Sequence, residues 1–73
     1  MLELNDYPVL LAISRKKSLY GAAKELNVAV STVMRRIEQI EKRSDAKLFH
    51  KTNSGYAPTA AGIILIDKAI EIE

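Results

Sequence analysis

Basic and hydroxyl-bearing side chains are grouped between residues 30 and 43 of this 73-residue chain. Arg35 carries a planar guanidinium whose paired donors fit the O6 and N7 atoms of guanine, and Ser31 and Thr32 carry hydroxyls that can bond a base or a phosphate. Arg36 lies about 100° round a helix from Arg35, so only one of the two can face the centre of a groove. These residue types predict hydrogen bonding to nucleic acid.

Further candidates lie on the same segment and on both sides of it. Val30 and Met34 offer only apolar surface, which suits a group such as the thymine methyl. Lys51 begins a run of small polar residues that can reach a DNA backbone or minor groove, and Ser18 opens a helix whose N–H groups can receive a phosphate. Ordinary turn and cap roles remain open for the tip of that run and for Ser18. The predicted DNA-contacting residues are Ser18, Val30, Ser31, Thr32, Met34, Arg35, Arg36, Lys51, Thr52, Asn53 and Ser54.

Other chemistries lack the residues that they need. The chain has no Cys, which excludes disulfides, a catalytic thiol and an iron–sulfur cluster, and its only His, His50, has no second His with which to share a metal. We expect His50 to be an ordinary strand residue. No catalytic carboxylate pair or Ser/His/Asp set is recognisable, and the three glycines are too far apart for a phosphate-binding loop. The sequence predicts no enzyme activity, no cofactor and no metal site.

The charges are distributed unevenly along the chain. The formal net charge is only +2, but residues 15–51 contain ten Lys or Arg and four Asp or Glu, a net charge of +6. The remaining residues contain one Lys and five acids, a net charge of −4. This uneven distribution of charge favours one face of the protein that binds a polyanion. A solvated surface on which the charges cluster by chance remains the alternative.

Hydrophobic spacing predicts the helices that position these side chains. A first helix covers residues 6–16, a second covers 19–26, and a third covers 30–43 with apolar residues at a period near 3.5. The small residues 21–23 predict a close crossing of the second and third helices, which is the order of a helix-turn-helix unit. The expected helix caps are Asn5 or Asp6, Ser18 and Thr59.

A short hairpin and a last helix follow. Residues 48–51 form the first predicted strand, 52–55 have the composition of a turn, and the return strand at 56–57 ends at Pro58, which has no N–H to donate. The last helix runs from about residue 60 to the end and is apolar on more than one face, so we expect it to need a partner. Its predicted dimerisation residues are Ile63, Ile66 and Ile70.

The predicted fold class is mainly α, a winged helix-turn-helix with three helices, a short β-hairpin wing and a C-terminal linker helix. Residues 1–58 form the predicted DNA-binding domain, and residues 59–73 begin the linker or dimerisation helix. In this arrangement helix 30–43 enters the major groove and wing 48–58 touches the backbone or minor groove.

Four stretches of the sequence together resemble LysR-type transcription regulators. Residues 18–28 (SLYGAAKELNV) are similar to the second helix of that family, and 35–41 (RRIEQIE) to the middle of its third helix. LFHK at 48–51 resembles the family pattern Leu-Phe-x-Arg, and PTAAG at 58–62 resembles Leu-Thr-x-Ala-Gly at the start of the linker helix. The resemblance covers nearly the whole chain and implies the N-terminal winged helix-turn-helix domain of such a regulator.

Several positions depart from the family pattern. Val30 stands where a polar base-reading residue is common, Met34 replaces a Ser, and Lys51 replaces an Arg. Asp45 replaces a frequent Gly, and Leu10 stands where the first helix often has Phe. We expect these changes to leave the fold intact and to make the base-reading surface more apolar.

The resemblance also implies partners. A homodimer formed through the linker helix would bind the two halves of an inverted-repeat operator in double-stranded DNA. A small-molecule effector is expected only on a C-terminal domain that this sequence lacks. No apolar run is long enough to span a membrane, and the first six residues do not resemble a secretion signal. The location that the resemblance implies is the bacterial cytoplasm, at the nucleoid. A winged-helix module for protein–protein contact remains the alternative.

Overall fold

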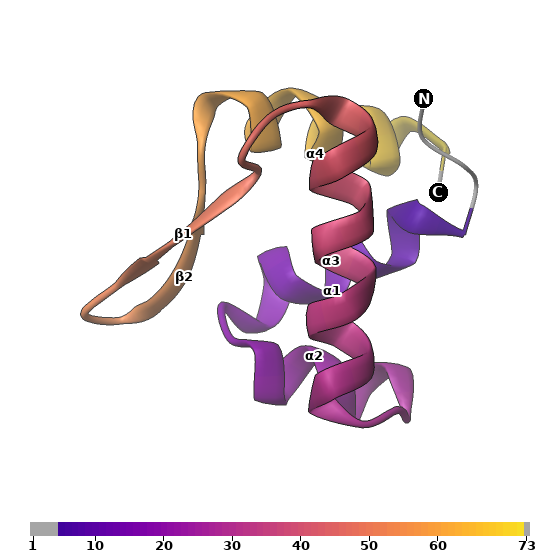
Figure 1. Ribbon diagram of the computed structural model, residues 1–73, viewed down its shortest axis with the longest axis vertical. Coiled ribbons are helices and arrows are strands. Elements are labelled where there is room, and N and C mark those ends of the chain that lie inside the picture. The colour runs from indigo at the N-terminus through magenta and orange to yellow at the C-terminus, as the bar shows by residue number, and fades with distance from the viewer. Residues whose placement is uncertain (1–4, 73) are drawn as a thin grey trace.

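The computed structural model describes residues 5–72, and within them four helices and one hairpin follow each other in the predicted order (Figure 1). The elements are α1 (Asp6–Lys16), α2 (Leu19–Leu26), α3 (Val30–Ser44), β1 (Phe49–Thr52), β2 (Gly55–Pro58) and α4 (Ala60–Ile72). Residues 1–4 of the predicted domain 1–58 and residue 73 of the predicted segment 59–73 lie outside the described residues. The predicted fold class, a mainly helical winged helix-turn-helix, is confirmed.

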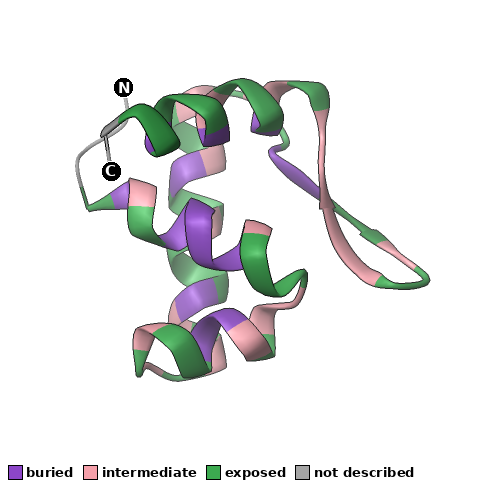
Figure 2. Ribbon diagram, turned by 180° about the vertical axis from the view of Figure 1, so that it is seen from behind, coloured by how far each residue is buried: buried purple, intermediate pink, exposed green. Residues whose placement is uncertain are grey.

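Helix α1 provides the centre of the hydrophobic core. Its residues 9–13 are all buried, and α2, α3 and α4 each contact it (Figure 2, purple). Val33 and Ile40 come from α3, and Leu48 and Phe49 close the core at the base of the hairpin. Because α1 fills the space between the other helices, α3 can expose one whole side to solvent.

Three helices end on a non-glycine residue in the left-handed conformation. Lys17 (φ 58°), Asn27 (φ 60°) and Asp45 (φ 55°) terminate α1, α2 and α3 respectively. Asn27 thus turns the chain between α2 and α3. Asp45, which stands where the family pattern often has Gly, adopts a left-handed conformation that Asn and Asp tolerate better than most residues. This departure from the family pattern leaves the helix end intact, as expected.

Two of the expected helix caps, Ser18 and Thr59, are present, and Asn5 forms no cap bond. The Ser18 hydroxyl accepts from the N–H of Gly21 at 2.8 Å, and the Thr59 hydroxyl accepts from the N–H of Gly62 at 3.1 Å. Asn5 stands at the start of α1 without a side-chain cap bond, so its predicted role as a cap is wrong. Asp6 lies in the first turn of α1, where its carboxylate accepts from the Arg43 guanidinium on α3.

The hairpin is longer than predicted. Thr52 pairs with Gly55, so only Asn53 and Ser54 form the loop, and the first strand begins at Phe49, after Leu48. Pro58 is the last residue of β2 and pairs with Phe49, whereas the sequence had placed it after the strand. Both strands of a two-stranded sheet are edge strands, and a sheet accommodates proline in its edge strands.

Candidate nucleic-acid interface

The crossing of α2 and α3 determines which side of α3 faces solvent. Ala22 and Ala23 are buried in the core with Val33 of α3. Gly21 has a different role from the one predicted for it, because a Cβ at that position would lie 2.8 Å from the Cβ of Lys16. Gly21 thus permits close packing against the end of α1, and the two alanines serve the crossing with α3.

The outward side of α3 carries the predicted base-contacting residues. Val33 and Ile40 point into the core, and at 100° per residue Ser31 and Arg35 lie on the opposite side. Ser31, Met34 and Arg35 are exposed, whereas Val30 and Thr32 are half-buried. Val30 packs against the core, so its apolar surface serves mainly the fold.

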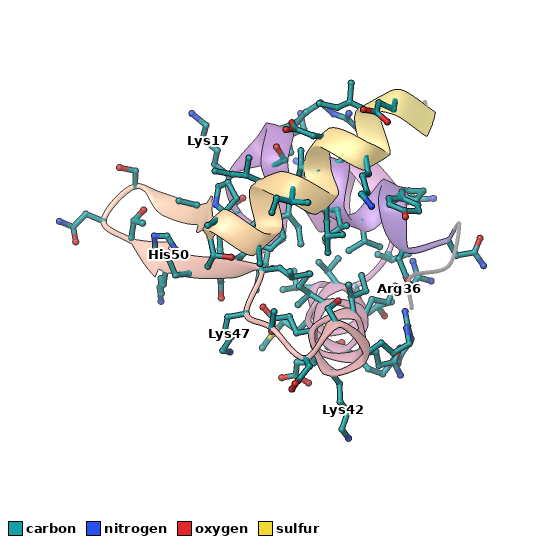
Figure 3. The ribbon with its side chains drawn as sticks, turned by 90° about the horizontal axis from the view of Figure 1, so that it is seen from above. Lys17, Arg36, Lys42, Lys47 and His50 are labelled. Carbon is teal, nitrogen blue, oxygen red and sulfur yellow. The ribbon has the colours of Figure 1, made fainter. Side chains whose placement is uncertain are left out.

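The two neighbouring arginines of α3 lie on different sides of the helix. Viewed along α3 in Figure 3, the hairpin lies on one side of the helix and Arg36 points to the other, while Lys42 points away from the core. Arg36 lies beside Gln39 and Arg43, near the start of α1. Arg35 is therefore the arginine better placed to share a ligand with the hairpin.

Arg43 takes part in holding α3 against α1. It forms an ion pair with Asp6, a residue that is only 9% exposed. A second ion pair joins α1 to α2 through Arg15 and Glu25. The hydrogen bond from Arg15 holds the pKa of the Glu25 carboxyl below its ordinary value of 4.5.

The hairpin tip presents fewer groups for contact than the sequence suggested. Lys51, Asn53 and Ser54 are exposed. The Thr52 hydroxyl donates to the carbonyl oxygen of Gly55 at 3.1 Å and accepts from the N–H of Ser54 at 3.2 Å, so it holds the turn together. The Ser18 hydroxyl is likewise engaged as a helix cap. Contacts from Thr52 and Ser18 to DNA stay predictions.

Three further lysines, which were not among the predicted DNA-contacting residues, lie on α3 or on the segments next to it and to the hairpin. Lys17, Lys42 and Lys47 are exposed, and so is His50 on the hairpin (Figure 3). Lys17 has a structural role as well, because its carbonyl oxygen accepts from the N–H of Tyr56 at 2.8 Å. Its position beside the hairpin depends on this long-range bond, and no local pattern in the sequence indicates it.

The last helix exposes part of its apolar surface. Ile63, Ile64 and Ile70 are 49%, 59% and 57% exposed. Ile66 is only 7% exposed and belongs to the core, so its predicted place on a dimerisation face is corrected. Ile64, which was not among the predicted dimerisation residues, is the most exposed of the three.

Two other kinds of feature are absent from the part of the chain that the structure describes. Among residues 5–72, no group of three or more His, Cys, Asp or Glu side chains is arranged to hold a metal ion. Within the same range, no helix is both long and apolar enough to cross a membrane.

Comparisons with known proteins point to one family. The model of the family described as "Bacterial regulatory helix-turn-helix protein, lysR family" matches residues 4–63. The HTH-type transcriptional regulator YofA of Bacillus velezensis is 37% identical over 71 residues, which are 97% of this chain and 25% of YofA. The HTH-type transcriptional regulator CzcR of Bacillus subtilis is 35% identical over 66 residues, which are 90% of this chain and 23% of CzcR. The chain thus spans about a quarter of the length of these relatives.

A solved structure shares the same fold. The crystal structure of the CbnR_DBD–DNA complex superimposes with a TM-score of 0.89 at 24% sequence identity, covering 97% of this chain and 82% of that one. At this identity the likeness concerns the fold, and it agrees with the arrangement of α2, α3 and the hairpin described above.

Proposed function

This chain belongs to the lysR family of bacterial regulatory helix-turn-helix proteins, and from that premise we propose how it binds DNA. The chain is a sequence-specific DNA-binding domain of a transcription regulator. The N-terminal half of α3 enters the major groove, and the wing formed by β1 and β2 lies on the adjacent backbone or minor groove. The observation that carries this proposal is the exposure of Ser31 and Arg35 on the side of α3 that faces away from the core, with Met34 exposed beside them towards the wing.

Each contacting residue has a distinct role in this proposal. Arg35 donates two hydrogen bonds to a guanine, and Ser31, one turn earlier, bonds a base or a phosphate. Lys51, Asn53 and Ser54 hold the wing on the backbone or minor groove. Arg36 lies on the opposite side of α3 from the wing and contacts a phosphate at the margin of the interface. Val30, Thr32, Thr52 and Ser18 act mainly by positioning these groups.

The proposed operator is an inverted repeat read by two copies of the chain. The exposed Ile63 and Ile70 lie seven residues apart on α4, so they share one side of the helix and can pack against the same helix of a second copy. Ala60–Ile72 is then the beginning of a linker helix that continues into the rest of a longer regulator. A small-molecule effector binds that remaining part, and the regulator acts at the nucleoid in the cytoplasm.

Fluorescence anisotropy with short duplexes across a salt series tests DNA binding. Neutralisation of several phosphates makes log K fall with log salt at a slope of about −0.9 for each contact. Selection from a random duplex library with the same chain then yields the half-site. Weak binding with a shallow salt dependence and no selected sequence would refute the proposal and favour a protein-contact module, for which the exposed isoleucines of α4 are the docking surface.

A further inference from the structure

We propose that Met34 reads the 5-methyl group of a thymine in the major groove, within one or two base pairs of the guanine bonded by Arg35. This inference rests on the proposed function and adds a specific base feature to it. In this proposal, recognition of one base of the half-site depends on contact with a methyl group. A polar residue at position 34 would instead recognise a base through a hydrogen bond.

The position of Met34 separates it from the other apolar residues of α3. It is 45% exposed and is the only large hydrophobic residue of α3 that is exposed. Val30, one turn earlier, and Ile37, nearly one turn later, are half-buried and pack against the core. Among these three residues, Met34 has the most apolar surface left for a ligand to cover.

The side chain is also supported on its inner side. Met34 lines a crevice between α3 and the wing, together with Ile37 of α3, Phe49 of β1 and Tyr56 of β2. The crevice holds one part of the side chain while the other part remains in solvent. An unbranched thioether can adjust its torsions to reach a ligand from such a support.

Charges around this crevice favour a base edge over the backbone. Glu38 is exposed and lines the same crevice one turn beyond Met34, where its carboxylate would repel a phosphate. Glu41 and Lys47 also line it, but these two charges lie 3.7 Å apart and the Glu41 carboxylate accepts from the N–H of Leu48 at 2.9 Å. We therefore place base edges, and not phosphates, opposite Met34.

The major groove offers one apolar group, the C5 methyl of thymine. Covering it with Met34 removes two apolar surfaces from water, whereas the hydrogen-bond donors and acceptors on the base edges require a polar partner. Met34 lies about 100° round α3 from Arg35, on the side towards the wing, so the two side chains reach different base pairs. Because neighbouring Cα atoms are only about 3.8 Å apart and base pairs stack about 3.4 Å apart, we place the thymine within one or two base pairs of the guanine read by Arg35.

The test removes the methyl group from the DNA and leaves the protein unchanged. After the half-site has been selected, each thymine in turn is replaced by deoxyuridine, which lacks only the 5-methyl group, and the Kd of the 73-residue chain is measured by anisotropy. We expect one replacement to raise Kd about fourfold, the effect of exposing one methyl-sized group. Equal affinity for the thymine and deoxyuridine duplexes at every position would overturn the proposal.

Protein variants then assign the effect to Met34. The variants Met34→Leu and Met34→Ser are measured on the same pair of duplexes, with matched thermal denaturation to verify folding. Met34→Leu should keep the preference for thymine, and Met34→Ser should bind both duplexes equally. If Met34→Ser keeps the full preference, another residue reads the methyl group and the proposal fails. Failure of the proposed function itself would appear earlier, as the absence of any selected half-site.

Discussion

The N–H of Tyr56 donates to the carbonyl oxygen of Lys17 at 2.8 Å, which ties the second strand of the wing to the end of α1. Gly55, next to Tyr56, makes this approach possible: its φ is 128°, and a Cβ there would lie 2.1 Å from the same carbonyl oxygen. The wing is thus placed relative to α3 by a backbone contact with the turn that begins the helix-turn-helix unit.

Replacing Gly55 by Ala should destabilise the domain and release the wing. The positive φ and the clash with Lys17 both oppose a side chain, so we expect a loss of at least about 1 kcal/mol in unfolding free energy. Urea denaturation measures the loss, and hydrogen exchange at the Tyr56 amide reports detachment of the wing. Ser54→Ala is the control, since Ser54 is exposed. An unchanged exchange rate in Gly55→Ala would contradict this role.

Arg43 should contribute more to the stability of the fold than its neighbour Lys42. Arg43→Ala leaves the nearly buried Asp6 without its ion-pair partner on α3, and we expect it to cost about 1–2 kcal/mol of stability. Lys42→Ala removes an exposed cation and should leave stability within about 0.5 kcal/mol of the parent. Thermal denaturation of both variants checks this contrast, and equal stability of the two would contradict it.

Arg35 should govern specificity, and Arg36 only affinity. Arg35→Ala removes a bidentate contact with guanine, worth about 1–3 kcal/mol, so affinity for the selected half-site should fall roughly 10- to 100-fold while binding to random DNA falls less. Arg36→Ala should weaken both kinds of DNA similarly and make the salt slope about one unit shallower. Anisotropy on the two duplexes distinguishes these patterns, and a reversed pattern would exchange the roles of the two arginines.

Different isoleucines of α4 should contribute to folding and to self-association. Ile66→Ala creates a cavity in the core and should cost about 2–4 kcal/mol. The double variant Ile63→Ser with Ile70→Ser changes exposed side chains only, so it should keep the fold and weaken self-association of the chain. Denaturation and sedimentation equilibrium provide the two measurements. Unchanged association in the double variant would exclude this face as the interface.

The Arg15–Glu25 ion pair should make the free energy of unfolding depend slightly on pH in the acidic range. The hydrogen bond from Arg15 lowers the pKa of Glu25 in the folded state, so the pair stabilises the fold above pH 4.5 and this contribution is lost as pH falls through the lowered value. In Arg15→Ala the pKa of Glu25 should return toward 4.5. A pH titration of the Glu25 carboxyl followed by NMR measures it, and an unchanged pKa would assign the shift to another group.

The sequence by itself determined the order of the elements, two of the three expected helix caps and the family resemblance. These features are local: apolar periodicity, a hydroxyl three residues before a helix N–H, and turn residues at Asn27 and in the hairpin each act over a few residues. Ser18 and Thr59 were therefore predicted from their neighbours alone. The exposed Arg35 and Ser31 also followed from the helical period, which places them opposite Val33.

Only the tertiary structure decided which of these groups remain available for a ligand. Arg43 pairs with Asp6 across 37 positions of the sequence, and Ile66 is buried where α4 packs on α1. The wing reaches its place through the bond between Tyr56 and Lys17. Helical periodicity gives the side of a helix on which a residue lies, but the neighbouring elements determine which sides they cover, and their positions depend on contacts between residues far apart in the chain.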